Sequence, residues 1–252
     1  MSTDTAVSVT DVTSGYGLLS VQGPESRSLL NTITTADLGN EAFPYFTAQE
    51  IDLDHSVGWA FRMSFVGELG WELYIPTEFT LGVYDRIVEA GAAFGLAHAG
   101  METLESARTE AGRKDYGLDM ENSDTALEAG LGFAVDFDKP DGFVGREALL
   151  KQRENRPLKS RLVLFLLEDP EPLLYGEEPI LHDGETVGYL RSGAYGHTLG
   201  GAMGFGYVTQ EEGVTLDFVK SGGFEIQVAG KRYPAAASFR PMYDPKNERV
   251  HM

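Results

Sequence analysis

Glu72 is the first residue whose surroundings indicate that it could bind a ligand. It lies in the stretch 64–76, where Trp71, Leu73 and Ile75 alternate with polar residues, a pattern that predicts a strand with one apolar face. A carboxylate on a stiff strand can accept from two adjacent N–H donors, such as those along the amino-pyrimidinone edge of a pterin or purine. The alternative is that Glu72 is simply exposed to solvent, as most acidic side chains are.

Arg108 is the second candidate, because it falls on the apolar side of a predicted helix. The segment 100–112 is typical of a helix that ends at Gly112, and Arg108 shares a stripe with Leu104 and Ala111. A guanidinium group in that position needs an anionic partner. The partner could be a buried acid of the chain or the carboxylate of a ligand, which arginine binds bidentately. Together the two candidates are compatible with a folate-like ligand, although they do not by themselves select it.

Other kinds of site have less support. The five histidines lack metal-ligand spacing, and the absence of cysteine excludes disulfides, thiolate catalysis and cysteine-ligated clusters. No Walker loop or serine nucleophile elbow is present, and Gly130-Leu131-Gly132 lacks the third glycine of a dinucleotide loop. The acidic residues between 115 and 141 are expected to form a solvated loop surface and not an acid–base pair.

The composition limits the partners. The chain has 252 residues and a formal net charge of −19, which repels nucleic acid and anionic membrane surfaces. No stretch approaches the roughly 20 apolar residues of a membrane span, and the first residues show no secretory signal. We therefore predict a soluble, cytoplasmic protein that binds neither nucleic acid nor membranes.

The predicted elements form an α+β region over residues 1–157 and a small β-barrel or sandwich over residues 158–252. In the first region, residues 7–13 are β-rich, further strands are predicted at 17–23, 46–53, 57–65 and within 64–76, and helices at 24–33, 78–94, 100–112 and 145–155. In the second, strands with glycine-rich turns are predicted at 162–167, 179–182, 185–192, 202–208, 214–218, 224–228 and 233–239.

Two turns are expected to depend on residues with positive φ. Gly67 and Gly70 bracket the turn that precedes Glu72, and glycine adopts positive φ without steric cost. Asp183-Gly184 separates two apolar runs and is a strong signal for a two-residue hairpin.

Several stretches resemble one family. Residues 65–72, Phe-Val-Gly-Glu-Leu-Gly-Trp-Glu, resemble the aromatic-x-Gly-Glu-x-Gly-x-Glu motif of the glycine cleavage T-protein, or aminomethyltransferase, family. The wider stretch 64–76 is most similar to the C-terminal folate domain of sarcosine and dimethylglycine dehydrogenases and oxidases. The resemblance covers nearly the whole chain, with further landmarks at Leu18–Pro24, Ala107–Gly112, Phe143–Arg146 and Gly204–Val208.

The resemblance implies a mixed α/β folate-binding domain followed by a C-terminal β-barrel. It implies that Glu72 holds the pterin ring and that Arg108 contacts folate. Phe65 replaces the family's usual tyrosine and keeps the stacking area without the hydroxyl group. Tyr243 is similar in position to a tyrosine near the family's active site.

The implied cofactor is tetrahydrofolate, with 5,10-methylenetetrahydrofolate as the product of transfer from a methylated amine donor. The chain shows no flavin motif, so the flavin step of the dehydrogenase relatives is expected to need another domain or a flavoprotein partner. An alternative is a non-catalytic scaffold or interaction subunit that keeps the fold. The related iron–sulfur maintenance proteins depend on a cysteine motif, which this chain lacks.

The resemblance leaves the catalytic residue unassigned. Family members carry a catalytic aspartate in a segment that precedes the Leu18–Pro24 landmark, and Asp11 lies at the wrong point of the pattern. We therefore expect either that another subunit supplies this N-terminal part or that the chain is a truncated or diverged form.

Overall fold

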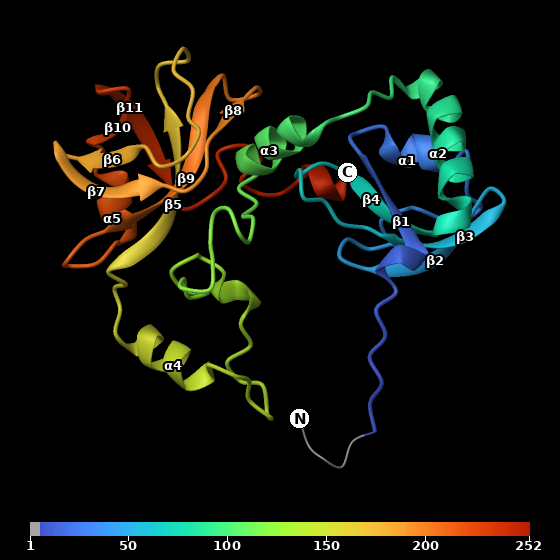
Figure 1. The fold of residues 1–252 in the computed structure, drawn as a ribbon, viewed down its shortest axis with the longest axis horizontal. Coiled ribbons are helices and arrows are strands. Elements are labelled where there is room, and N and C mark those ends of the chain that lie inside the picture. The colour runs from blue at the N-terminus through green and yellow to red at the C-terminus, as the bar shows by residue number, and fades with distance from the viewer. Residues whose placement is uncertain (1–5) are drawn as a thin grey trace. The chain divides into compact units, whose positions relative to one another are not determined.

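The computed structural model describes residues 6–252, which form two compact units (Figure 1). Unit 1 extends to His98 and also contains Asn247–Met252, and unit 2 comprises Ala99–Lys246. No helix within the described residues is long and apolar enough to cross a bilayer.

Unit 1 is built on a four-stranded antiparallel sheet in the order β1-β4-β3-β2. Its elements are the 3₁₀ helix η1 (Thr13–Gly15), β1 (Tyr16–Gln22), α1 (Ser26–Leu30), β2 (Ala48–Leu53), β3 (Ser56–Phe61), β4 (Gly70–Pro76), α2 (Thr77–Gly91) and the 3₁₀ helices η2 (Ala92–Phe94) and η4 (Arg249–His251).

The predicted alternation along β4 is confirmed. Trp71, Leu73 and Ile75 are fully buried and form one core with residues of α1 and of α2, such as Val83 and Ile87. This core covers one face of the sheet. Because side chains alternate along a strand, the residues between these three point to the other face, and Glu72 is among them.

Three expectations for unit 1 are wrong in detail. Residues 7–12 form no strand, and β3 ends at Phe61. Gly67 has the expected positive φ of 78°, but Gly70 does not share it and is the first residue of β4. A Cβ atom on Gly70 would lie 2.5 Å from the backbone oxygen of Val21, so glycine is needed there for close packing between β4 and β1.

Unit 2 contains a closed six-stranded barrel, which confirms the predicted fold class. The barrel runs β5-β11-β10-β6-β7-β9 and closes through pairing of β5 with β9, while β8 pairs with the beginning of β9. The elements are α3 (Met101–Glu110), η3 (Gly132–Ala134), α4 (Arg146–Glu154), β5 (Ser160–Leu167), β6 (Pro179–His182), β7 (Glu185–Leu190), β8 (Ala194–Gly196), β9 (Gly201–Thr209), α5 (Leu216–Lys220), β10 (Phe224–Val228) and β11 (Lys231–Ser238).

Of the elements predicted for the barrel region, the hairpin at Asp183-Gly184 is confirmed and the strand at 214–218 is wrong, and local interactions explain both outcomes. Asp183 and Gly184 both have positive φ, 50° and 86°, and form the predicted hairpin between β6 and β7. The strand predicted at 214–218 is wrong, because α5 begins there. The Thr215 side chain caps this helix by accepting a hydrogen bond from Phe218 N at 3.1 Å, a preference that outweighs the β propensity of the segment.

The two compact units divide the chain at a different point from the predicted 157/158 boundary, which stays a prediction about the family's domains. The helix α3 belongs to unit 2 because it packs against β8. Ser106 Oγ donates to Tyr195 O at 2.6 Å, and the Glu110 carboxylate accepts from Thr198 N and Leu199 N at 2.8 and 2.9 Å.

Candidate functional site

Glu72 lies on the face of the unit 1 sheet opposite to the α1 and α2 core. Its direct cross-strand neighbours are Ser20 on β1 and Phe61 on β3, and Tyr74 follows on the same strand. The Phe61 and Tyr74 rings contact each other with centroids 4.9 Å apart and planes tilted by 60°. The carboxylate therefore lies beside aromatic surface.

Burial raises the pKa of Glu72, and a hydrogen bond with Tyr74 offsets part of that increase. Burial also raises the pKa of Tyr74, and the neighbouring Glu72 charge raises it further. A half-buried carboxylate beside aromatic rings can accept N–H donors from the edge of a planar ligand ring.

The raised pKa of Glu72 predicts a pH-dependent gain in stability on removing its charge. The folded state holds this proton more tightly than the unfolded state. The stability that the protonated group contributes is therefore full below the ordinary pKa of glutamate and is lost as pH rises through the raised pKa of Glu72 in the folded state. Glu72→Gln is therefore expected to need more urea than the parent for unfolding at pH 7, with the difference shrinking at pH 4. Glu50→Gln, an exposed glutamate of β2, is the control. A Glu72→Gln protein less stable than the parent at pH 7 would contradict the prediction.

The other residue predicted in unit 1, Phe65, lies in the loop between β3 and β4 and is partly exposed. Sequence reasoning missed Phe61 and Tyr74 as the aromatic neighbours of Glu72. The signal was present in part, since Tyr74 shares the period-2 face of Glu72. The pairing of Phe61 with Glu72 required the register of β3 against β4, which the sequence does not specify.

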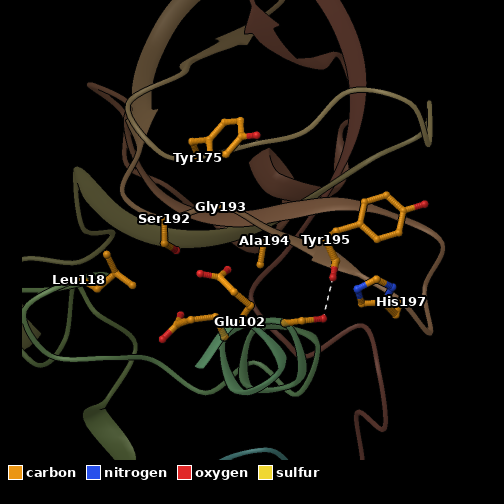
Figure 2. A pocket seen from close by; sticks show the side chains of 10 residues that line it. Glu102, Leu118, Tyr175, Ser192, Gly193, Ala194, Tyr195 and His197 are labelled. Carbon is orange, nitrogen blue, oxygen red and sulfur yellow. Dashed lines mark hydrogen bonds between the residues drawn. The ribbon is translucent and has the colours of Figure 1, made fainter. Parts of the chain in front are cut away.

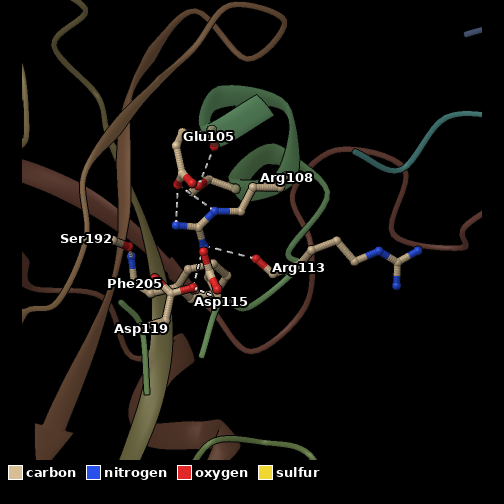
Figure 3. A network of polar contacts seen from close by, with 8 residues as sticks. Glu105, Arg108, Arg113, Asp115, Asp119, Ser192 and Phe205 are labelled. Carbon is tan, nitrogen blue, oxygen red and sulfur yellow. Dashed lines mark hydrogen bonds and ion pairs between the residues drawn. The ribbon is translucent and has the colours of Figure 1, made fainter. Parts of the chain in front are cut away.

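Arg108 is fully buried and engaged by groups of the chain itself (Figure 3). Nε and Nη2 donate to Glu105 Oε2 at 2.8 and 2.6 Å, while Nη1 donates to Arg113 O at 3.1 Å and forms an ion pair with Asp119 Oδ2. Asp119 Oδ2 also accepts from Asp115 N at 2.7 Å. From the sequence, the partner of Arg108 is expected to be either a buried acid of the chain or the carboxylate of a ligand. In the structure, acids of the chain itself pair with Arg108.

Asp119 corrects the expectation that the acidic middle segment is uniformly solvated. Its side chain is fully buried, because the loop from Arg113 to Asp119 folds back on Arg108. Its second oxygen, Oδ1, is buried without a hydrogen-bond partner. Burial lowers the pKa of the adjacent Lys114, and the Asp119 charge offsets part of that decrease. Asp119 is thus part of the polar interior of unit 2.

A cavity of about 230 Å³ lies beside this network, between α3 and the β8 segment (Figure 2). Glu102 and Glu105, one helical turn apart, supply two carboxylates, and Glu105 is also the partner of Arg108. The lining includes no lysine or arginine, so the cavity favours ligand groups that donate hydrogen bonds or carry positive charge. The lining residues are Glu102, Glu105, Ser106, Leu118, Tyr175, Ser192, Gly193, Ala194, Tyr195 and His197.

Tyr243 follows β11 in unit 2 and is partly buried. Its backbone N donates to Glu110 O at 3.4 Å, so it lies at the same end of α3 as Arg108. The structure thus places Arg108 and Tyr243 in unit 2, and Phe65 and Glu72 in unit 1. The ligand roles of all four residues remain predictions.

Comparison with known proteins identifies the family. Residues 1–139, more than half of the chain, match the family model of the GCVT N-terminal domain. Residues 160–244 match the glycine cleavage T-protein C-terminal barrel domain. The chain belongs to the glycine cleavage T-protein family. The predicted resemblance is confirmed, and the barrel match begins at the first residue of β5.

Two curated relatives of this T-protein family member are longer proteins that are named as a dehydrogenase and an oxidase. Human mitochondrial sarcosine dehydrogenase is 40% identical over 242 residues, which are 95% of this chain and 26% of that protein. The formaldehyde-forming 4-methylaminobutanoate oxidase of Paenarthrobacter nicotinovorans is 40% identical over 245 residues, 97% of this chain and 29% of that protein. This T-protein family member therefore spans between a quarter and a third of the length of these relatives.

A solved structure supports the fold of this T-protein family member. The glycine cleavage system aminomethyltransferase T from Bartonella henselae matches with a TM-score of 0.74 at 21% identity. The match covers 90% of this chain and 60% of that chain. At this identity the likeness concerns the arrangement of the elements.

Proposed function

We propose that this chain binds tetrahydrofolate and serves the transfer of a one-carbon group onto it. The observation that carries the proposal is the half-buried Glu72 carboxylate beside the Phe61 and Tyr74 rings. The carboxylate offers two acceptor oxygens for the N–H groups of the pterin, and the rings offer apolar surface for its plane. Membership of the T-protein family supports the choice of a folate over another planar ligand.

The proposed chemistry is a condensation at the oxidation level of formaldehyde. Tetrahydrofolate supplies two nitrogen atoms that together take up the methylene carbon, and water or the donor amine leaves, which gives 5,10-methylenetetrahydrofolate. Within unit 1, Glu72 fixes the orientation of the pterin and Phe65 stacks on it. The proposed folate contacts of Arg108 and Tyr243, which lie in unit 2, rest on the family resemblance alone. A methylated amine is the donor, and a flavoprotein or another domain carries out its oxidation. The names of the two curated relatives, a sarcosine dehydrogenase and a formaldehyde-forming oxidase of a methylamino acid, support this donor class.

Isothermal titration with tetrahydrofolate under anaerobic conditions tests the proposal. The parent chain is expected to show saturable binding, and Glu72→Ala is expected to weaken it about 10- to 100-fold, the range for losing hydrogen bonds to a charged group. Glu50→Ala, which removes an exposed carboxylate from the same sheet, should bind like the parent.

Two outcomes would count against the proposal. A Glu72→Ala protein that binds as tightly as the parent would remove Glu72 from the site. Absence of saturable binding by the parent, both alone and with a flavoprotein partner, would overturn the folate function itself.

A second candidate function is a non-catalytic subunit that keeps the fold and associates with a flavoprotein. The observation that favours it is the internal pairing of Arg108 with Glu105 and Asp119, which engages the helix arginine inside the chain. Copurification with a flavoprotein, together with no turnover of sarcosine or dimethylglycine plus tetrahydrofolate, would support this alternative over catalysis.

A further inference from the structure

We propose that Arg249 is a positioning residue for the folate motif, acting through Glu68. Glu68 is the first glutamate of the motif in residues 65–72, and the proposed function gives it no role. The inference rests on the proposed folate site, because Phe65 and Glu72 lie on either side of Glu68 in that motif.

The segment 247–252 is fixed to unit 1 by several contacts. Val250 is 1% exposed, and its carbonyl accepts from Arg62 Nη2 at 3.1 Å. The carbonyl of His251 accepts from Asn40 Nδ2 at 2.9 Å, and the His251 ring packs edge-on against Tyr45 at 5.1 Å between centroids. Arg249 directly precedes Val250, so these contacts hold Arg249 at a defined position on unit 1.

The loop 62–69 is held at both ends by backbone hydrogen bonds. At its start, Arg62 N donates to Thr47 O at 3.0 Å, and at its end, Leu69 O accepts from Gly23 N at 2.8 Å. These bonds join the ends of the loop to neighbouring parts of unit 1. The middle of the loop, which contains Phe65, needs other contacts to hold one conformation.

Glu68 supplies those contacts for the middle of the loop. Its backbone N donates to Ser64 Oγ at 3.0 Å, and its two carboxylate oxygens lie 2.7 and 2.8 Å from Arg249 Nε. Glu68 lies directly after Gly67, whose positive φ sets the turn, and shortly before β4. The ion pair therefore fixes the turn from which the strand carrying Glu72 begins.

The pair is suited to positioning more than to stabilising the whole fold. The Arg249 and Glu68 side chains are 37% and 21% exposed, and ion pairs of that exposure add little to global stability. A charge-assisted contact can nevertheless select one conformation of a loop. We therefore expect effects on ligand affinity and loop dynamics that exceed the effect on unfolding.

A double-mutant cycle tests the coupling on the full chain. Arg249→Ala and Glu68→Ala are each expected to weaken tetrahydrofolate binding about tenfold, and the double variant should lose less than the two single losses combined, since the two residues contact each other. Exchanging the charges, with Glu68→Arg and Arg249→Glu together, should restore part of the affinity. Lys159→Ala, which breaks the exposed Lys159–Glu211 pair of unit 2, is the matched control and should bind like the parent. Parent-like binding by Arg249→Ala, or additive losses in the double variant, would overturn the proposal.

Hydrogen exchange of the amides of residues 64–69 gives a readout that needs no ligand. These amides are expected to exchange faster in Arg249→Ala than in the parent, while the urea midpoint changes little. Unchanged exchange would overturn the positioning role. If the parent does not bind tetrahydrofolate, the proposed function fails, and the exchange measurement alone then decides whether Arg249 positions the loop.

Discussion

Replacing Asp119 by alanine is expected to lower the free energy of unfolding by about 3–5 kcal/mol, the range for removing one partner of a buried ion pair. Asp119 and Arg108 are both fully buried, and the ion pair between them is joined by the bond from Asp115 N to the Asp119 carboxylate. The alanine variant leaves the Arg108 guanidinium group with Glu105 as its remaining ion-pair partner. Urea unfolding at pH 7, followed by circular dichroism, measures the loss.

Two further variants show whether the charge or the hydrogen bonds matter at this position. Asp119→Asn keeps one acceptor oxygen for Arg108 Nη1 and Asp115 N but removes the charge, so an intermediate loss is expected. Lys159→Ala removes an ion pair whose side chains are 65% and 85% exposed, and should leave the unfolding curve unchanged. If Asp119→Ala lowered the free energy of unfolding by less than about 1 kcal/mol, the Arg108–Asp119 pair would not stabilise the fold as a buried ion pair is expected to.

The parts of the fold that follow from short-range patterns could be predicted from the sequence. The period-2 alternation around Glu72 identifies β4 and its buried face, since a strand sends successive side chains to opposite sides. The hairpin at Asp183-Gly184 follows from the preference of these residues for positive φ. At 214–218, in contrast, a single N-cap hydrogen bond of Thr215 decides for a helix, and apolar composition alone does not reveal it.

The candidate site shows where long-range contacts limit sequence reasoning. The sequence indicates that Arg108 needs an anion, but its hydrogen-bonded partners depend on how the loop to Asp119 folds back. The contact between Glu68 and Arg249 joins residues 181 positions apart, and no local pattern predicts it. Short-range patterns therefore identify which residues need a partner, and the tertiary structure determines which partner each one has.

Trp71 has the other large effect, and Trp71→Ala is expected to lower the free energy of unfolding by about 3–5 kcal/mol, as large-to-small substitutions of buried aromatic residues do. Its side chain is fully buried, and Phe43 packs edge-on against it with ring centroids 6.2 Å apart. The guanidinium carbons of Arg27 and Arg62 each lie 5.7 Å from the Trp71 ring centroid. Alanine would therefore leave a cavity in the core and also remove the aromatic surface beside the buried Arg62.

Trp71→Phe tests how much of the stability depends on the indole ring itself and how much on having an aromatic ring at this position. The Trp71 Nε1 atom is buried without a hydrogen-bond partner, so phenylalanine gives up no hydrogen bond and keeps a ring at this position. Its loss of stability in urea unfolding is expected to be less than half that of Trp71→Ala. Equal losses for the two variants would instead mean that the indole ring itself is required, because a phenyl ring would then not support Arg62 and Phe43 in the core. That result would assign the stability of unit 1 to the specific shape of Trp71, the residue immediately before Glu72, and not to apolar volume on the buried face of β4.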